Sequence, residues 1–217
     1  MIHAIVFDFD GVLADSEPLH LATYQEIFST LGVTLTREEY YADYLGYDDE
    51  GVFRLMAAKH GWELDAAQIA ALIARKSIVF DDLVANRNVL YPGAAEAVER
   101  LASAYPLGIA SGALRHEIEM ILKNARLAGH FGFIVAAGET PEGKPAPDPY
   151  IRAATLHGQI PEACVAIEDS RWGIVSAKEA GMKCVGITNT YPATELTHAD
   201  AVIDSLQDFT EQLIRTL

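Results

Sequence analysis

Four acidic side chains lie where they could share one chemical task. Asp8 and Asp10 directly follow the apolar segment 2–7, and Glu168 and Asp169 follow another short apolar segment late in the chain. Two carboxylates about 4 Å apart repel each other by roughly 4 kcal/mol at an effective dielectric constant of about 20. A convergent group of them would need a cation. Their hard oxygen atoms favour Mg²⁺, which commonly bridges one or two carboxylates to a substrate phosphate.

The same residues have the types that phosphoryl transfer requires. The Asp8 carboxylate could attack phosphorus and form an aspartyl-phosphate. Asp10, two residues further on, could protonate the leaving oxygen and later deprotonate water. The Ser111 hydroxyl could donate to a phosphoryl oxygen, while Lys144 offsets the charge on the equatorial oxygens. These residues therefore predict a Mg²⁺-dependent reaction on a phosphate ester.

A parallel sheet would bring these distant residues together. The segment 2–7 is nearly all apolar and rich in β-branched residues, which is typical of a strand buried on both faces. Beyond the turn at 91–93, short apolar strands alternate with helices, and this alternation predicts parallel βαβ units. We expect further strands at 106–110, 133–136, 164–167, 183–187 and 201–203, and helices at 94–104, 114–126, 149–157, 171–180 and 206–216.

The intervening segment, from about 16 to 88, shows helix signals and no convincing strand. Ser16 offers an N-cap for a first helix, and Asp65 with Gln68 forms a capping-box pattern. A lone first strand has no partner within this segment, so it must join the later sheet. The sequence therefore predicts an α/β fold with a doubly wound parallel core and an inserted all-helical cap. We expect the core at 1–15 plus 89–217 and the cap at 16–88.

Ligands of a doubly wound sheet bind outside the carboxyl ends of its strands, at the point where the strand order reverses. We therefore expect a single site at that edge of the sheet. Its candidate residues are Asp8 and Asp10 after the first strand, Ser111 and Gly112 after the second, Lys144 after the third, and Glu168 and Asp169 after the fourth.

Composition limits the partners and the compartment. Lys and Arg number 16 against 31 Asp and Glu, a net charge of −15, and no cluster of cations favours binding to nucleic acid. No apolar run approaches the roughly 18 residues of a membrane span. The N-terminus has no basic leader, and Cys164 and Cys184 lie in apolar runs, as expected of buried thiols. We expect a cytoplasmic protein that binds a small phosphorylated metabolite, with no nucleic-acid, membrane or obligate protein partner.

The candidate residues resemble the four motifs of the haloacid dehalogenase superfamily, in order and over the whole chain. The resemblance implies a Rossmann-like core, a helical cap, an obligatory Mg²⁺ and a phospho-aspartate intermediate. It also implies that Asp8, the backbone carbonyl of Asp10 and Asp169 hold the metal, with Glu168 alongside. The matching residues are Asp8-Phe9-Asp10-Gly11 with Asp15-Ser16, then Ser111, then Lys144-Pro145, then Glu168-Asp169-Ser170 with Gly173.

Within the superfamily, the chain most resembles the beta-phosphoglucomutase group. The dehalogenases of the superfamily lack the second Asp of the first motif, so Asp10 favours phosphoryl transfer over C–halogen cleavage. His20 and Lys76 match residues that the mutase uses to link its cap to the catalytic centre. For both residues, the alternative of a solvated surface side chain stays open.

Two departures from the mutase pattern favour hydrolysis. The stretch Gly46-Tyr47-Asp48-Asp49 offers acids where the mutase cap has an arginine that grips the distal phosphate, and Ala113 stands where the mutase has a further serine. Carboxylates there disfavour a bisphosphate. We therefore expect a phosphatase that hydrolyses a small sugar phosphate or a similar monoester. A phosphomutase of the beta-phosphoglucomutase type is the alternative, and a non-catalytic phosphometabolite-binding protein is an alternative of another class.

Overall fold

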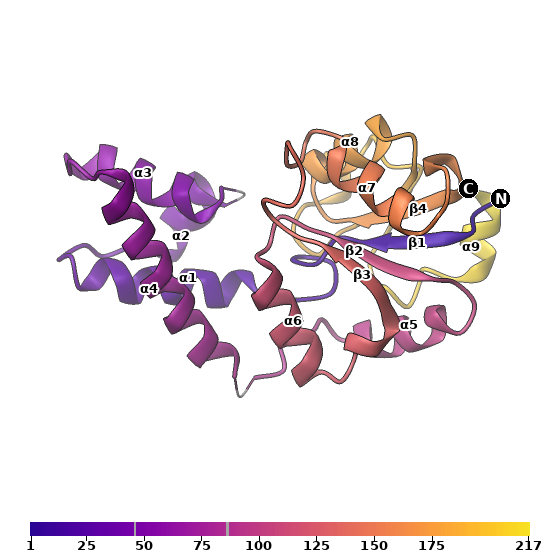
Figure 1. The fold of residues 1–217 in the computed structure, drawn as a ribbon, viewed down its shortest axis with the longest axis horizontal. Helices are drawn as coiled ribbons and strands as arrows, with labels where there is room; N and C mark the ends of the chain where they lie inside the picture. Colours follow the sequence, from indigo (N-terminus) through magenta and orange to yellow (C-terminus); the bar gives the residue numbers. More distant parts are fainter. Residues whose placement is uncertain (46, 86) are drawn as a thin grey trace. The chain divides into compact units, whose positions relative to one another are not determined.

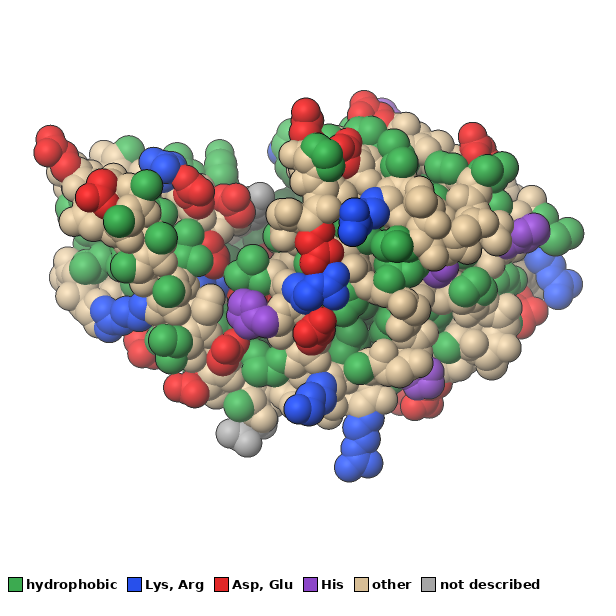
Figure 2. All heavy atoms as spheres, viewed as in Figure 1, with side chains coloured by type: hydrophobic (Ala, Val, Ile, Leu, Met, Phe, Trp, Pro, Cys, Tyr) green, Lys and Arg blue, Asp and Glu red, His purple; other side chains and the backbone are tan. Residues whose placement is uncertain are grey.

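The computed structural model describes residues 1–45, 47–85 and 87–217 and divides into two compact units (Figure 1). One unit comprises 1–15 and 88–217, and the other comprises 16–87. On the face drawn in Figure 2, acidic side chains are interspersed with Lys and Arg over the described residues. Within the described ranges, no helix is both long enough and apolar enough to cross a membrane.

The first unit is built on a six-stranded sheet with the order β3-β2-β1-β4-β5-β6, in which all neighbouring strands are parallel. The chain winds outward from β1 through β2 and β3 on one side and through β4, β5 and β6 on the other. This order confirms the doubly wound fold and places the reversal point between β1 and β4. The strands are β1 Ala4–Phe7, β2 Leu107–Ala110, β3 Phe131–Val135, β4 Cys164–Glu168, β5 Lys183–Ile187 and β6 Ala201–Ile203.

Helices cover both faces of this sheet, with α7 and α8 on one face and α5 on the other (Figure 1). The last helix is shorter than the expected 206–216. It begins at Glu211 because the Thr210 side chain accepts a hydrogen bond from Leu213 N, and two turns precede this cap. The helices are α5 Ala94–Ala102, α6 Arg115–Asn124, α7 Asp148–Leu156, α8 Arg171–Glu179 and α9 Glu211–Thr216.

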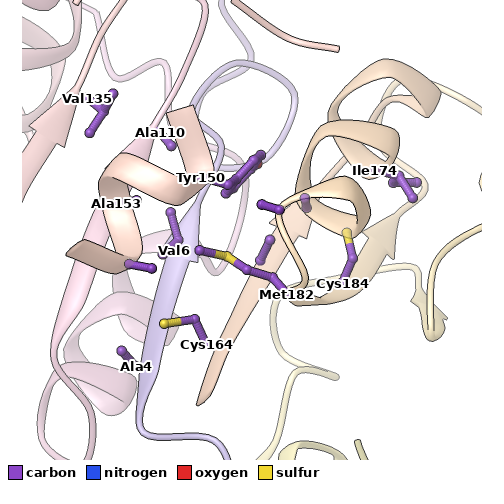
Figure 3. Close-up of a cluster of buried hydrophobic side chains, with 14 of the residues drawn as sticks. Ala4, Val6, Ala110, Val135, Tyr150, Ala153, Cys164, Ile174, Met182 and Cys184 are labelled. Atoms are coloured by element: carbon purple, nitrogen blue, oxygen red, sulfur yellow. The ribbon is translucent and has the colours of Figure 1, made fainter. Parts of the chain in front are cut away.

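Side chains from five strands, β1 to β5, pack against α7 and α8 in a buried cluster (Figure 3). Ala4 and Val6 of β1 contribute to it, because alternate residues of a strand face the same side. Cys164 and Cys184 lie in the same cluster as free, buried thiols, as the sequence predicts. Burial raises the pKa of the Cys164 thiol to about 11, so this thiol stays protonated and unreactive near neutral pH.

The second unit is helical, and its described residues contain no β-strand. Asp65 and Gln68 form the expected reciprocal capping box at the start of α4, with bonds of 2.8 and 2.9 Å. Ser16 differs from expectation: its backbone is already helical (φ −86°, ψ −21°), and its side chain makes no cap hydrogen bond. The helices are α1 Glu17–Ser29, α2 Arg37–Glu39, a π-helix Tyr40–Tyr44, α3 Asp49–His60 and α4 Ala66–Val84.

Aromatic side chains give the helical unit a core of its own. The ring of Phe53 on α3 packs edge-on against Tyr24 and Phe28 of α1, with centroid distances of 5.8 and 5.6 Å. All three side chains are almost completely buried. Because aromatic burial dominates the packing energy of small cores, the segment 16–87 holds together through its own contacts.

Candidate active site

The acids from the two ends of the chain meet at the carboxyl edge of the sheet. Phe7 of β1 pairs with Ile167 of β4, so Asp8 and Glu168, one residue further along each strand, lie side by side. Asp169 follows directly. Asp8, Glu168 and Asp169 are all buried, and each offers a carboxylate oxygen within 4.8 Å of the others. The reversal point of the sheet therefore carries three closely spaced carboxylates, as expected from the strand ends.

Lys144 brings its ammonium group into this cluster from the loop after β3. Its Nζ lies 2.6 Å from Glu168 Oε1 and 2.9 Å from Asp8 Oδ1. The Tyr150 hydroxyl, on α7, also donates to Glu168 Oε1, at 2.6 Å. Asp8 Oδ1 forms the ion pair with Lys144 but has no aligned hydrogen-bond donor among the described residues. This buried oxygen can therefore accept a hydrogen bond or coordinate a cation.

Burial and mutual repulsion set the charge of the cluster. Burial raises the pKa of Asp169 well above its usual range, and the charges of Asp8 and Glu168 raise it further. Burial likewise raises the pKa of Glu168, followed by the charge of Asp8. Burial by itself would lower the pKa of Lys144, but the two nearby carboxylates raise that pKa above its ordinary value. One ammonium faces three carboxylates, so the site fits an additional cation, and its all-oxygen donor set suits Mg²⁺.

The turn after β1 explains why a glycine follows Asp10. Gly11 has φ of +74°, and a Cβ atom there would overlap the Asp169 carboxylate. The Phe9 carbonyl accepts hydrogen bonds from the backbone N–H groups of the next turn, including that of Leu13 at 2.9 Å. Asp10 lies in this tight turn and is partly buried. The spacing of the first motif therefore follows from a compact backbone turn over the acidic cluster.

Ser111 and Gly112 follow β2, the neighbour of β1 on the other side. Ser111 is buried, and its hydroxyl oxygen accepts a hydrogen bond of 3.2 Å from Ala113 N. A Cβ atom at Gly112 would meet nothing within 4 Å, so open space lies next to this backbone. Both residues therefore lie at the same edge of the sheet as the acids.

Sequence reasoning missed three residues of the site. Tyr150 contacts Glu168, Asn189 Nδ2 donates to the Gly11 carbonyl oxygen at 2.8 Å, and the Thr190 hydroxyl lies beside the Asp169 carboxylate. Asn189 and Thr190 follow β5 at the carboxyl edge. The rule that identified Ser111 could therefore have found them, whereas Tyr150 carries no local signal in its helix.

His20 and Lys76 lie together in the helical unit, and the structure excludes a solvated position for Lys76. The Lys76 side chain is 1% exposed, and its Nζ lies 2.9 Å from both His20 Nδ1 and Asp49 Oδ1. An ammonium group only donates, so His20 Nδ1 accepts and the ring is neutral. Burial, followed by the charge of Lys76, lowers the pKa of His20 well below its ordinary value.

The acids expected to repel a second phosphate have partners within the helical unit. Asp48 is the N-cap of α3 and accepts a hydrogen bond from Gly51 N at 2.8 Å. Asp49 forms the buried ion pair with Lys76 and accepts a hydrogen bond from the Tyr24 hydroxyl. Gly46, the first residue of that stretch, lies outside the described residues. The charge of Asp49 is therefore balanced locally, which weakens the argument from repulsion.

Fold and site together define a protein of the doubly wound α/β class with an acidic centre at its reversal point. Residues 5–187 match the haloacid dehalogenase-like hydrolase family, and the chain belongs to it. Hexitol phosphatase B from Escherichia coli strain K12 is 33% identical, covering 96% of this chain and 95% of that protein. Family and relatives identify the chain as a phosphatase and leave the non-catalytic alternative without support.

Two solved structures place the fold among similar proteins. A mutant of CbbY from Rhodobacter sphaeroides in complex with xylulose-(1,5)-bisphosphate is 29% identical, covers 95% of each chain and has a TM-score of 0.83. Beta-phosphoglucomutase from Clostridium difficile has a TM-score of 0.87 over 100% of this chain and 96% of that one. At 22% identity, the mutase shows the shared fold alone.

Proposed function

We propose that this chain is a Mg²⁺-dependent phosphomonoesterase that hydrolyses a small sugar phosphate through an aspartyl-phosphate on Asp8. The observation that carries the proposal is the buried cluster of Asp8, Glu168 and Asp169 around the ammonium of Lys144. When all three carboxylates are ionised, such a cluster has a net negative charge, which a divalent ion would offset. The similarity to hexitol phosphatase B supports a phosphorylated sugar or sugar alcohol as the substrate class.

The metal ligands in this proposal are Asp8, Asp169 and the backbone carbonyl of Asp10, with Glu168 alongside. Glu168 has Lys144 and Tyr150 as partners, so we assign it mainly the task of holding Lys144 in place. A bound Mg²⁺ would offset the carboxylate charge and polarise a phosphoryl oxygen.

In the first step, a carboxylate oxygen of Asp8 attacks phosphorus while the bond from phosphorus to the sugar oxygen breaks. Asp10 gives its proton to the leaving oxygen, so the sugar departs as an alcohol. Asp10 then removes a proton from water, and the resulting nucleophile attacks phosphorus. This second step breaks the bond between phosphorus and Asp8, releases inorganic phosphate and regenerates the enzyme.

The remaining residues of the core bind and orient the phosphoryl group. Lys144 keeps its positive charge because two carboxylates raise its pKa, and it can offset charge on the phosphoryl oxygens. The Ser111 hydroxyl and the open backbone at Gly112 complete the cradle. We further propose that the helical unit acts as a cap that excludes bulk water during the reaction, with His20 and Lys76 contributing to substrate binding.

A sugar bisphosphate is a second candidate substrate. CbbY, with 29% identity, has been solved with xylulose-(1,5)-bisphosphate bound. In this chain Asp49 is neutralised by Lys76, and Asp48 caps a helix, so the two acids oppose a second phosphate less than free carboxylates would. A phosphomutase remains an alternative reaction at the same site, because it would use the same aspartyl-phosphate.

The test is a phosphate-release assay with Mg²⁺ on hexose phosphates, hexitol phosphates, pentose phosphates and pentulose bisphosphates. We expect inorganic phosphate from at least one of these sugar phosphates, and no release after EDTA treatment or with the Asp8→Asn variant. Turnover that survives EDTA, or an undiminished Asp8→Asn variant, contradicts the mechanism. Isomerisation of a hexose 1-phosphate with almost no free phosphate identifies a mutase instead.

A further inference from the structure

We propose that Asn189 and Thr190, which follow β5, are positioning residues for the metal ligands. Asn189 would fix the backbone turn that carries Asp10, and Thr190 would orient the Asp169 carboxylate. The inference deepens the proposed function and rests on it, because it concerns the same Mg²⁺ site. Neither residue follows β1 or β4, the strands that supply the acids.

Asn189 reaches the turn after β1 from a point 178 residues later in the chain. Its Nδ2 donates to the Gly11 carbonyl oxygen at 2.8 Å. The Gly11 N–H bonds the Ala14 carbonyl at 2.9 Å, so both backbone polar groups of Gly11 are held. The Asp10 carbonyl and the Gly11 N–H belong to one planar peptide, which the bond to Ala14 holds, and the Asn189 bond anchors the next peptide. Together the two bonds keep the Asp10 carbonyl, an expected ligand, in one orientation.

Thr190 lies next to the second expected metal ligand, the Asp169 carboxylate. Its hydroxyl lies beside the Asp169 carboxylate and can donate a hydrogen bond to it. A Cβ atom built on Gly11 would lie 2.6 Å from Thr190 Oγ1 and would overlap Asp169. The turn of Gly11, the Thr190 hydroxyl and the Asp169 carboxylate therefore meet in one small volume, which a side chain at position 11 would fill.

The physical effect is that of an outer layer of hydrogen bonds around a metal. Ligands that are held in their binding orientation lose less freedom when the ion binds, and removing such partners typically costs 10- to 100-fold in metal affinity or activity. Thr190→Val keeps the shape of the side chain and removes only its hydrogen bond. We expect this variant to bind Mg²⁺ roughly 10- to 100-fold more weakly than the wild type.

The preceding residue supplies a matched control. Thr188 Oγ1 donates to the Asp204 carboxylate at 2.7 Å, in the same segment and with the same chemistry. Asp204 does not belong to the acidic cluster of the described residues. Thr188→Val therefore removes a hydroxyl-to-carboxylate bond without touching the proposed site, and its Mg²⁺ affinity should equal that of the wild type.

The experiment measures the rise in melting temperature of the substrate-free protein over a series of Mg²⁺ concentrations, which yields a dissociation constant without turnover. We expect weaker binding for Thr190→Val and Asn189→Ala, recovery in Thr190→Ser, and no change in Thr188→Val. The same melting curves show which variants are folded. If Thr190→Val does not fold, the comparison of Asn189→Ala with Thr188→Val decides.

Two failures remain distinguishable. If the wild type gains no stability from Mg²⁺, the proposed metal site is wrong. If the wild type binds Mg²⁺ and folded Thr190→Val and Asn189→Ala bind it equally well, only the positioning role is wrong. Equal weakening in Thr188→Val also overturns that role, because the effect would then come from the whole segment.

Discussion

At the scale of single residues, Lys144 links the acids of the first and fourth motifs. Its ammonium contacts both Asp8 and Glu168, and Glu168 is completely buried. A buried carboxylate that loses its cation is strongly unfavourable, because desolvation is no longer offset by the ion pair. Lys144 therefore contributes to the stability of the core, in addition to its proposed role in phosphate binding.

We predict that Lys144→Met lowers the free energy of unfolding by about 3 to 5 kcal/mol and abolishes phosphate release. Urea denaturation without Mg²⁺ and the phosphate-release assay measure the two effects. Lys178→Met is the control: Lys178 pairs with Asp200 at the surface, Lys183 also contacts Asp200, and exposed pairs contribute at most about 1 kcal/mol. Equal stability of Lys144→Met and Lys178→Met would refute the stabilising effect of the Lys144 ion pairs.

His20 gives a pH-dependent contribution whose sign follows from its lowered pKa. Folded His20 stays neutral at pH values where the unfolded chain binds a proton, so the stability is present above the ordinary pKa of 6.5 and declines below it. We predict that the free energy of unfolding falls by up to about 1.4 kcal/mol per pH unit between about pH 6.5 and 5. Urea unfolding should show a smaller slope for His20→Asn; identical slopes would assign the effect to other groups.

At the scale of elements, the turn after β1 is tightly constrained. Gly11→Ala would meet both an unfavourable left-handed backbone and an overlap with Asp169. We predict at least about 100-fold lower activity, because small displacements of reacting groups cost that much. Gly32→Ala is the matched control, since Gly32 has φ of +76° and open space around it. This control should lose about 1 to 2 kcal/mol of stability and keep its activity.

Comparable activity losses in Gly11→Ala and Gly32→Ala would show that backbone strain alone is responsible. Loss in Gly11→Ala alone would support close packing of the turn against Asp169. The phosphate-release assay at saturating Mg²⁺, with melting temperatures for both variants, separates these results.

At the scale of the whole molecule, the net charge of −15 opposes the approach of an anionic substrate. The phosphate must enter a negative field and reach a site where Lys144, together with the proposed Mg²⁺, would offset the local negative charge. We predict that kcat/KM for a phosphate monoester at saturating Mg²⁺ rises a few-fold when NaCl increases from about 10 to 150 mM, because salt screens the repulsion. A fall over the same range would indicate that a positive local field guides the substrate.

The sequence alone was sufficient for the parallel sheet, for the helical segment and for the meeting of Asp8, Lys144, Glu168 and Asp169. Strand burial shows in local apolar runs, and the carboxyl ends of parallel strands always lie at one edge, so residues placed there must converge. The roles of the site residues remain predictions. The start of α9 was misjudged because Thr210 is one of several possible caps.

Only the tertiary structure decided which side chains contact one another across strands and helices. Nothing near Lys76 in the sequence indicates that Asp49 and His20 enclose it, and nothing near Asn189 points to Gly11. Periodicity reports the face of an element on which a residue lies, whereas a hydrogen bond also depends on the register and packing of the neighbouring elements. Those are set by the whole fold, and so are the contacts of the proposed metal ligands.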